Sequence, residues 1–235
     1  ATSQRLNLNR DYIKADAPEM RALLGLINQW NPDLLIDSHT TNGADYQYDL
    51  TWSMDNDATQ HPRLRAWQNE VLVGRVQPRL ERGGHLIAPY IELNDPVDPT
   101  KGFTNFGAGP RYSTGYAVAR GRVGLLLETH MLKPYPVRVR APYDVIAAIL
   151  DEIAAQPGQL RAATRQVDAD TIARAADAAA TYPIQLANAG IAEDFVFKGF
   201  DWTVAQSDIS GDRWIRYDPS KPKTFTVPFY RQVKI

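Results

Sequence analysis

The sequence predicts an α/β fold built on a mixed, largely parallel sheet with helices on both faces. Two apolar runs, residues 34–36 and 123–127, lack the alternation of a half-exposed strand and end abruptly in polar residues. Such runs are typical of strands that are covered on both faces. An amphipathic stretch precedes the first run, and a strand-helix-strand order favours parallel pairing. We expect this α/β core to span residues 1–157, followed by a small helical and β-rich appendage over residues 158–235.

The composition indicates ordinary globular material. The chain has 235 residues, and its 26 basic and 27 acidic residues leave a net charge of -1. No basic surface therefore argues for nucleic acid as a partner. No apolar run approaches the roughly 20 residues that a membrane-spanning helix needs, so we expect no membrane span. The absence of cysteine excludes disulfides, thiolate metal sites and cysteine nucleophiles, while the compartment and the oligomeric state stay open.

Both ends of the chain look interrupted. It begins at Ala1 without an initiating Met, on the polar-apolar alternation of residues 5–9, and it ends in strand-like sequence over residues 224–235. The first residues also lack the apolar core of a signal peptide. We therefore expect the core to be incomplete at its N-terminus.

The individual elements follow from apolar spacing and from helix-start residues. Residues 5–9 alternate as in a short strand. The next helix is expected to start at a capping-box-like pair, Asp16 and Glu19, with Pro18 in its first turn, and to stop at Asn31. A further helix is expected over residues 62–80, disturbed by Pro78 and ended by Gly83, and a Pro- and Gly-rich loop over residues 92–115. Pro142 is expected to open another helix, and residues 159–180 to form an Ala-rich helix or helix pair. From Phe195 onwards we expect β-structure, with turns at Ser210, Gly211 and Pro219.

The chemically useful residues gather at the ends of the two apolar runs. The first run is followed by Asp37, Ser38 and His39, and the second by Glu128 and His130. If the two strands are parallel neighbours, His39 and Glu128 meet at the carboxyl edge of the sheet, where ligands of open α/β sheets bind. A hydrogen-bonded loop histidine would explain His39 equally well. For His130 we prefer a structural hydrogen bond just past the strand end.

Other candidate residues have plainer explanations. His61 and His85 flank the helix over residues 62–80 and are expected to be surface or helix-capping histidines, because neither has a ligand-type residue at a useful spacing. The aromatic residues Tyr46 and Tyr48 are expected to pack in the core rather than line a pocket. No nucleophile elbow, phosphate-binding loop or dinucleotide fingerprint is present. Metal-dependent hydrolysis or no catalysis remains.

Three short motifs carry a family resemblance. Asn9-Arg10, Asp37-Ser38-His39 and Leu127-Glu128, in that order, resemble the M14 zinc metallocarboxypeptidases of the carboxypeptidase A type. The resemblance covers roughly residues 5–155 and implies a carboxypeptidase-like fold, a peptide partner with a free C-terminal carboxylate, and a periplasmic or secreted location. It implies that Asn9 and Arg10 grip that carboxylate, that His39 is a zinc ligand, and that Glu128 activates a zinc-bound water. A guanidinium can read a carboxylate bidentately, and imidazole is a common zinc ligand.

Two further features bear on this resemblance. Residues 110–116 are similar to a bacterial branch of the family, which makes Arg111 and Tyr112 additional candidates for substrate contact. The family's upstream His-x-x-Glu zinc motif has no counterpart, since no histidine of this chain is followed by glutamate three residues later. A catalytic zinc site normally has three protein ligands. We therefore expect the other zinc ligands before Ala1.

Three hypotheses follow. In the first, which we favour, the chain is part of an M14-type carboxypeptidase in an incomplete form that is impaired or inactive. In the second, it is a non-catalytic module that binds peptide C-terminal carboxylates through its Asn-Arg pair. In the third, the i, i+2 pairs Asp37 with His39 and Glu128 with His130 share strand faces and form a rearranged metal site. A role as an amidase on cell-wall peptides stays open, as does the preferred terminal side chain.

Overall fold

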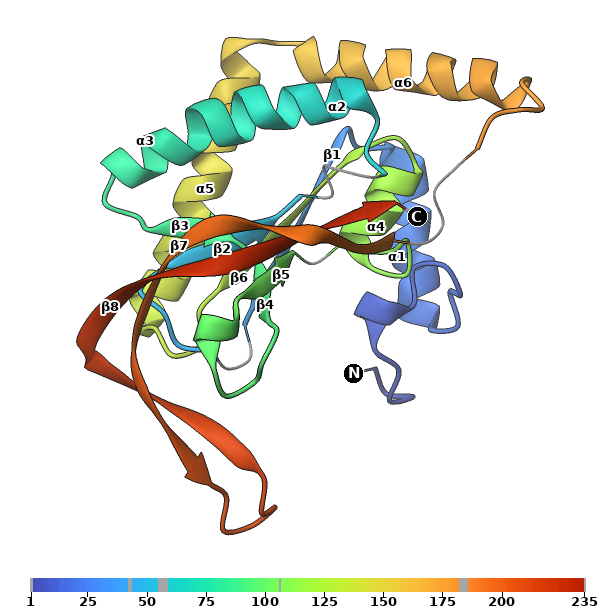
Figure 1. Ribbon diagram of the computed structural model, residues 1–235. Helices are drawn as coiled ribbons and strands as arrows, with labels where there is room; N and C mark the ends of the chain where they lie inside the picture. Colours follow the sequence, from blue (N-terminus) through green and yellow to red (C-terminus); the bar gives the residue numbers. More distant parts are fainter. Residues whose placement is uncertain (1, 42–43, 55–58, 106, 182–185, 235) are drawn as a thin grey trace.

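The computed structural model describes residues 2–41, 44–54, 59–105, 107–181 and 186–234. Within these residues the chain forms two four-stranded sheets (Figure 1). The first sheet has the order β1-β6-β2-β3, with the bounds Leu34–Thr40, Val123–Thr129, Leu50–Ser53 and Ile87–Pro89. The second has the order β4-β5-β8-β7, with the bounds Ile91–Leu93, Phe103–Asn105, Arg213–Lys234 and Leu186–Gln206.

Both sheets are mixed, so the predicted α/β class with a mixed sheet is confirmed. In the first sheet β1 pairs parallel with β6, and β2 pairs parallel with β3, but β2 runs antiparallel to β6. In the second sheet β5 and β8 are parallel, while β4 with β5 and β7 with β8 are antiparallel. Short connections between sequence neighbours favour antiparallel pairing. The expectation of a largely parallel sheet is therefore not confirmed.

Two groups of helices flank the first sheet. The first group comprises α2 (Pro62–Trp67), the π-helical η2 (Gln68–Val76), α3 (Gln77–Arg82), α5 (Tyr135–Ala155) and α6 (Gln159–Ala175). It shares the main apolar core with Val123, Leu125 and Leu127, the fully buried alternate residues of β6. The second group, α1 (Pro18–Trp30) and α4 (Ser113–Ala119), lies apart from the first in Figure 1. Since alternate strand residues face opposite sides, α4 contacts the other face of β6 at Gly124.

The N-terminal segment differs from the prediction. The strand expected over residues 5–9 is wrong, because Leu8–Arg10 forms a short 3-10 helix, η1. The side chain of Asn7 accepts a hydrogen bond from the backbone N–H of Asn9, and such local bonds compete with strand pairing. The expected capping box at Asp16 is also wrong. Instead the carboxylate of Asp11 accepts hydrogen bonds from the N–H groups of Asp16 and Ala17, at 3.1 and 2.9 Å.

The middle helices also differ in detail. The region predicted as one helix over residues 62–80 is helical throughout, but η2 interrupts its α-helical pattern: Gln77 N–H donates to the carbonyl of Leu72, five residues earlier. Pro78 lies in the first turn of α3 rather than near a helix end. Pro142 does not open a helix either, because α5 starts at Tyr135 and continues through it. None of the helices in the described part of the chain combines the length and hydropathy needed to cross a membrane.

The loop predicted over residues 92–115 is only partly irregular. It contains most of β4, the 3-10 helix η3 (Pro99–Lys101), all of β5 and the start of α4. The short strand β5 is held in the second sheet by β8, a partner more than a hundred residues away in the sequence. Pairing with so distant a strand leaves no trace in local composition.

The C-terminal β-structure is one long hairpin. The turn predicted at Ser210 and Gly211 is confirmed, since residues 207–212 connect β7 to β8. The turn predicted at Pro219 is wrong: β8 continues through it, and the strand register shifts there, from Phe200 opposite Pro222 to Asp201 opposite Asp218. The extra residues form a bulge.

The hairpin is joined to the rest of the chain by backbone pairing and side-chain packing. The Tyr48 hydroxyl accepts a hydrogen bond from Lys198 N–H at 3.0 Å. Tyr46 and Phe103 pack with Phe197 of β7 and Phe229 of β8, which confirms the packing role that was expected for Tyr46 and Tyr48. The second sheet thus draws strands from both sides of the predicted boundary at residue 157, and the division into two domains stays a prediction.

Candidate functional site

The parallel pairing of β1 and β6 creates the candidate site. His39 lies opposite Glu128 and Asp37 lies opposite Leu126. Registered residues of adjacent strands project to the same face, so Asp37, His39 and Glu128 share one face near the carboxyl ends of both strands. The predicted convergence of His39 with Glu128 is confirmed. β1 is the edge strand of its sheet and is only partly buried, contrary to the expected cover on both faces.

Glu128 is the buried carboxyl group of the site. The residue is 8% exposed, and burial raises the pKa of its carboxyl to about 7, an increase that His39 opposes and Asp37 reinforces. No hydrogen-bond donor to this carboxyl is found among the described residues. A carboxyl with a pKa near neutrality can both take up and release a proton, as a general base must.

Asp37 and His39 form a hydrogen-bonded pair. Nε2 of His39 lies 2.9 Å from Oδ2 of Asp37, and the Ser113 hydroxyl donates a short hydrogen bond to the same oxygen. Burial raises the pKa of Asp37, but the bonds from His39 and Ser113 together outweigh it and lower the pKa overall. The bond to Asp37 raises the pKa of His39, with burial and the charge of Arg10 opposing the increase.

The 3-10 helix η1 brings a third segment to the same place. Nδ2 of Asn9 lies 3.5 Å from Nε2 of His39, and Oδ1 of Asn9 accepts a hydrogen bond from Ser113 N–H at 3.3 Å. Asn9, His39 and Ser113 come from three stretches separated by 30 to 104 positions. The structure thus brings the predicted residues Asn9 and His39 together.

Arg10, Arg111 and Tyr112 form a cationic edge beside these residues. The Arg10 guanidinium lies 4.3 Å from the centroid of the Tyr112 ring, and that of Arg111 lies 5.3 Å from it. Both distances fall within cation-π range. Arg10 also donates a 2.6 Å hydrogen bond to the Asn9 carbonyl. The four predicted substrate-contact residues, Asn9 included, therefore lie together.

Three further residues belong to the site and were not proposed from the sequence. Ser113 joins Asp37 to Asn9. Burial raises the pKa of Tyr90 to about 12; the nearby charge of Glu128 adds to this increase and that of Arg10 opposes it. Burial also raises the pKa of Tyr12 to about 12, with the charge of Asp37 adding to the effect. The only available signal was that Ser113 directly follows Tyr112 in the segment that resembles the family.

The remaining histidines have structural roles. His130 is fully buried: Nε2 donates to the Ala44 carbonyl, and Nδ1 accepts from Leu132 N–H at 3.0 Å. The structural hydrogen bond preferred for His130 is confirmed, and the rearranged metal site loses this ligand. Nδ1 of His61 accepts from Arg63 N–H at the start of α2, which confirms a capping role. His85 lies between two carboxylates instead, 3.4 Å from Asp49 and 3.0 Å from Asp144.

The described residues do not fit a complete zinc site. No three of their His, Cys, Asp or Glu side chains form a group that could hold a metal ion. His39 has the chemistry of a ligand, but its Nε2 lies 2.9 Å from Oδ2 of Asp37 and donates its proton there. The described part of the chain thus does not supply by itself the three ligands that a catalytic zinc normally has.

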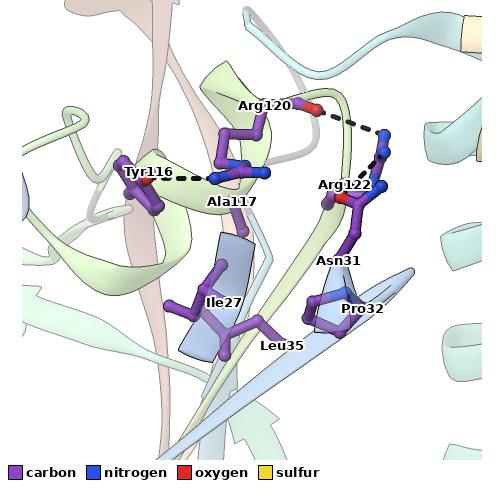
Figure 2. A pocket seen from close by; sticks show the side chains of 8 residues that line it. All are labelled: Ile27, Asn31, Pro32, Leu35, Tyr116, Ala117, Arg120 and Arg122. Carbon is purple, nitrogen blue, oxygen red and sulfur yellow. Dashed lines mark hydrogen bonds between the residues drawn. The ribbon is translucent and has the colours of Figure 1, made fainter. Parts of the chain in front are cut away.

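A shallow pocket lies elsewhere, at the amino ends of β1 and β6. It is lined by Ile27, Asn31, Pro32, Leu35, Tyr116, Ala117, Arg120 and Arg122 (Figure 2). Its cations are engaged: Arg122 binds Asn31 and both carboxylate oxygens of Asp168, and Arg120 binds Tyr116. This pocket is separate from His39 and Glu128, which lie near the other ends of the same strands. Its lining contains no Asp, Glu or His side chain.

Comparison with known proteins gives no relationship to report. No protein-family model, no curated protein and no solved structure matches this chain.

Proposed function

We propose that this chain provides the carboxylate-binding and general-base residues of a zinc-dependent, metallocarboxypeptidase-like hydrolase that removes C-terminal residues from peptides. The proposal rests on the register of β1 with β6, which places His39 opposite Glu128. The side chain of Asn9 contacts His39 at the same place. The order of these residues along the chain matches the M14 resemblance. Three distant segments meet in the arrangement that this reaction would use.

The proposed roles follow from charge and position. Asn9 and Arg10 bind the terminal carboxylate of the peptide, Arg10 with the guanidinium N–H groups that are not bonded to the Asn9 carbonyl. Glu128 takes a proton from the attacking water and passes it to the amine that leaves when the peptide C–N bond breaks. Asp37 and Ser113 hold His39 in place. Zinc would polarise the water and the carbonyl, with His39 as one ligand and the remaining ligands outside the described residues.

A second candidate function uses the same residues without chemistry. Arg10, Arg111 and Tyr112 form a cationic edge that requires no metal. A module with this edge would bind peptide C-terminal carboxylates through Asn9 and Arg10 without cleaving them.

One set of measurements on the full chain separates the two candidates. Zinc content is measured by elemental analysis, release of C-terminal residues from free-acid peptides is followed with added zinc, and binding of free-acid and amidated peptides is compared by calorimetry. The hydrolase predicts zinc-dependent release that Glu128→Gln abolishes and that the exposed control Glu81→Gln retains. Binding of free acids without release supports the module. Equal binding of free-acid and amidated peptides would rule out the proposed role of Arg10 in both candidate functions. Release of C-terminal residues by Glu128→Gln would rule out Glu128 as the general base of the hydrolase.

A further inference from the structure

Two arginines share one aromatic ring at the candidate site. The guanidinium carbons of Arg10 and Arg111 lie 4.3 and 5.3 Å from the Tyr112 centroid, so they are less than about 10 Å apart. Both arginine side chains are exposed. Contact with one ring keeps the two positive charges near each other.

These two charges have no carboxylate partner in the described part of the chain. Elsewhere arginines pair with acids: Arg79 with Asp151 at 2.6 Å and Arg161 with Asp33 at 2.8 Å. For Arg10 and Arg111 no ion pair with a described residue is present. The nearby Asp37 carboxylate is already bound by His39 and Ser113. The cationic edge thus has two guanidinium groups that no carboxylate of the described residues pairs with.

Arg10 lies next to the reacting end of the site, since it directly follows Asn9, whose Nδ2 is 3.5 Å from Nε2 of His39. Its positive charge opposes the increases in the pKa values of both His39 and Tyr90, which belong to two different strand ends. Arg111 is held beside it by Tyr112 and by its own carbonyl, which accepts Tyr12 N–H at 3.4 Å. A ligand that contacts Arg10 therefore has Arg111 within reach.

We propose that this site selects peptides whose last residue is acidic, with Arg10 binding the α-carboxylate and Arg111 binding the side-chain carboxylate of a C-terminal Glu or Asp. This inference rests on the proposed binding of a terminal carboxylate and adds the class of terminal side chain. Two carboxylates a few bonds apart complement two guanidiniums on one ring, because each guanidinium can donate two parallel hydrogen bonds to a carboxylate. An apolar or basic terminal side chain would leave Arg111 unpaired or repelled.

The test varies the two carboxylates independently. Four peptides of otherwise identical sequence end in Glu, Gln, Glu amide or Gln amide, and their binding to the full chain is measured by calorimetry with a chelator present so that none is cleaved. The same series is run on Arg111→Gln, on the charge-retaining Arg111→Lys, and on Arg165→Gln, which removes an exposed arginine of α6 far along the chain. Circular dichroism checks that each variant folds.

The expected result is a preference for Glu over Gln of about fivefold, the upper range for an exposed ion pair. The preference disappears in Arg111→Gln, is partly retained in Arg111→Lys and is unchanged in Arg165→Gln, while the preference for acid over amide persists in all of them. Equal binding of Glu and Gln by the wild-type chain, with acid still preferred over amide, overturns this inference alone. Loss of the acid-over-amide preference in the wild-type chain instead overturns the proposed function.

Discussion

Replacing Gly124 by alanine should destabilise the chain, because this glycine lets α4 approach β6. A Cβ at position 124 would lie 2.7 Å from both Cα and the carbonyl oxygen of Thr114, whereas ordinary contacts begin at 3.4 Å. These are backbone atoms of α4, so no side chain can swing away. The helix would have to move off the sheet by several tenths of an ångström, or β6 would have to bend.

The expected cost is that of overpacking a well-packed site, about 1–3 kcal/mol of unfolding free energy. The matched control is Gly25→Ala on the exposed face of α1, where an added Cβ meets nothing within 4 Å. This change should stabilise by about 0.5–1 kcal/mol, because alanine favours helix over glycine. The same chemical substitution is thus expected to have opposite signs at the two positions.

Chemical denaturation followed by circular dichroism measures both effects. Movement of α4 also carries Ser113 away from Asp37 and from Asn9, whose bond to Ser113 N–H is already 3.3 Å. Gly124→Ala should therefore weaken binding of free-acid peptides as well. A Gly124→Ala chain as stable as wild type, or more stable, would show that α4 and β6 are not in the contact described.

Two further predictions concern the same region. Ser113→Ala should lower the free energy of unfolding by about 1 kcal/mol, since it removes a hydrogen bond to the charged Asp37 carboxylate, whereas the exposed Ser38→Ala should stay within about 0.5 kcal/mol; equal effects in denaturant titrations would contradict the bond. In an NMR titration, His39 should titrate above and His130 below the ordinary value of 6.5. The stability that His39 contributes is then present in full below pH 6.5 and is lost as the pH rises through its folded-state pKa. The stability that His130 contributes is present above pH 6.5 and is lost as the pH falls through its folded-state pKa. A His39 pKa below that of His130 would refute the assigned partners.

The sequence predicted β1, β6 and their meeting point because the signal was local. An unbroken apolar run followed by polar residues marks a strand and its end, and parallel pairing then places His39 opposite Glu128. Side-chain rules of strands were enough to anticipate which residues share a face. The hydrogen-bonded role of His130 was likewise predictable from its position past the end of β6.

Contacts between distant segments could not be predicted in this way. Nothing near Ser113 announces that its hydroxyl meets Asp37, 76 positions earlier. The alternation at residues 5–9 looks like a strand, yet the Asn7 side chain closes a local turn instead. Pro142 looks like a helix start, yet the buried residues Ala141 and Val145 continue the core-facing side of α5 across it. At Pro142 tertiary packing outweighed a local preference, whereas at residues 5–9 one local interaction outweighed another.

The site contains two carboxyl groups on one sheet face with opposite electrostatic environments. Asp37 accepts hydrogen bonds from His39 and Ser113, which hold its pKa below the usual range in spite of burial. Glu128 has no such donors among the described residues, and burial raises its pKa to about 7. One carboxyl thus stays ionised and orients an imidazole, while the other exchanges a proton near neutral pH. Pairs of carboxyl groups whose pKa values are pushed apart are a recurring basis for acid-base chemistry. This division of roles gives an independent reason, beside the order of the motifs, to assign proton transfer to Glu128 rather than to Asp37.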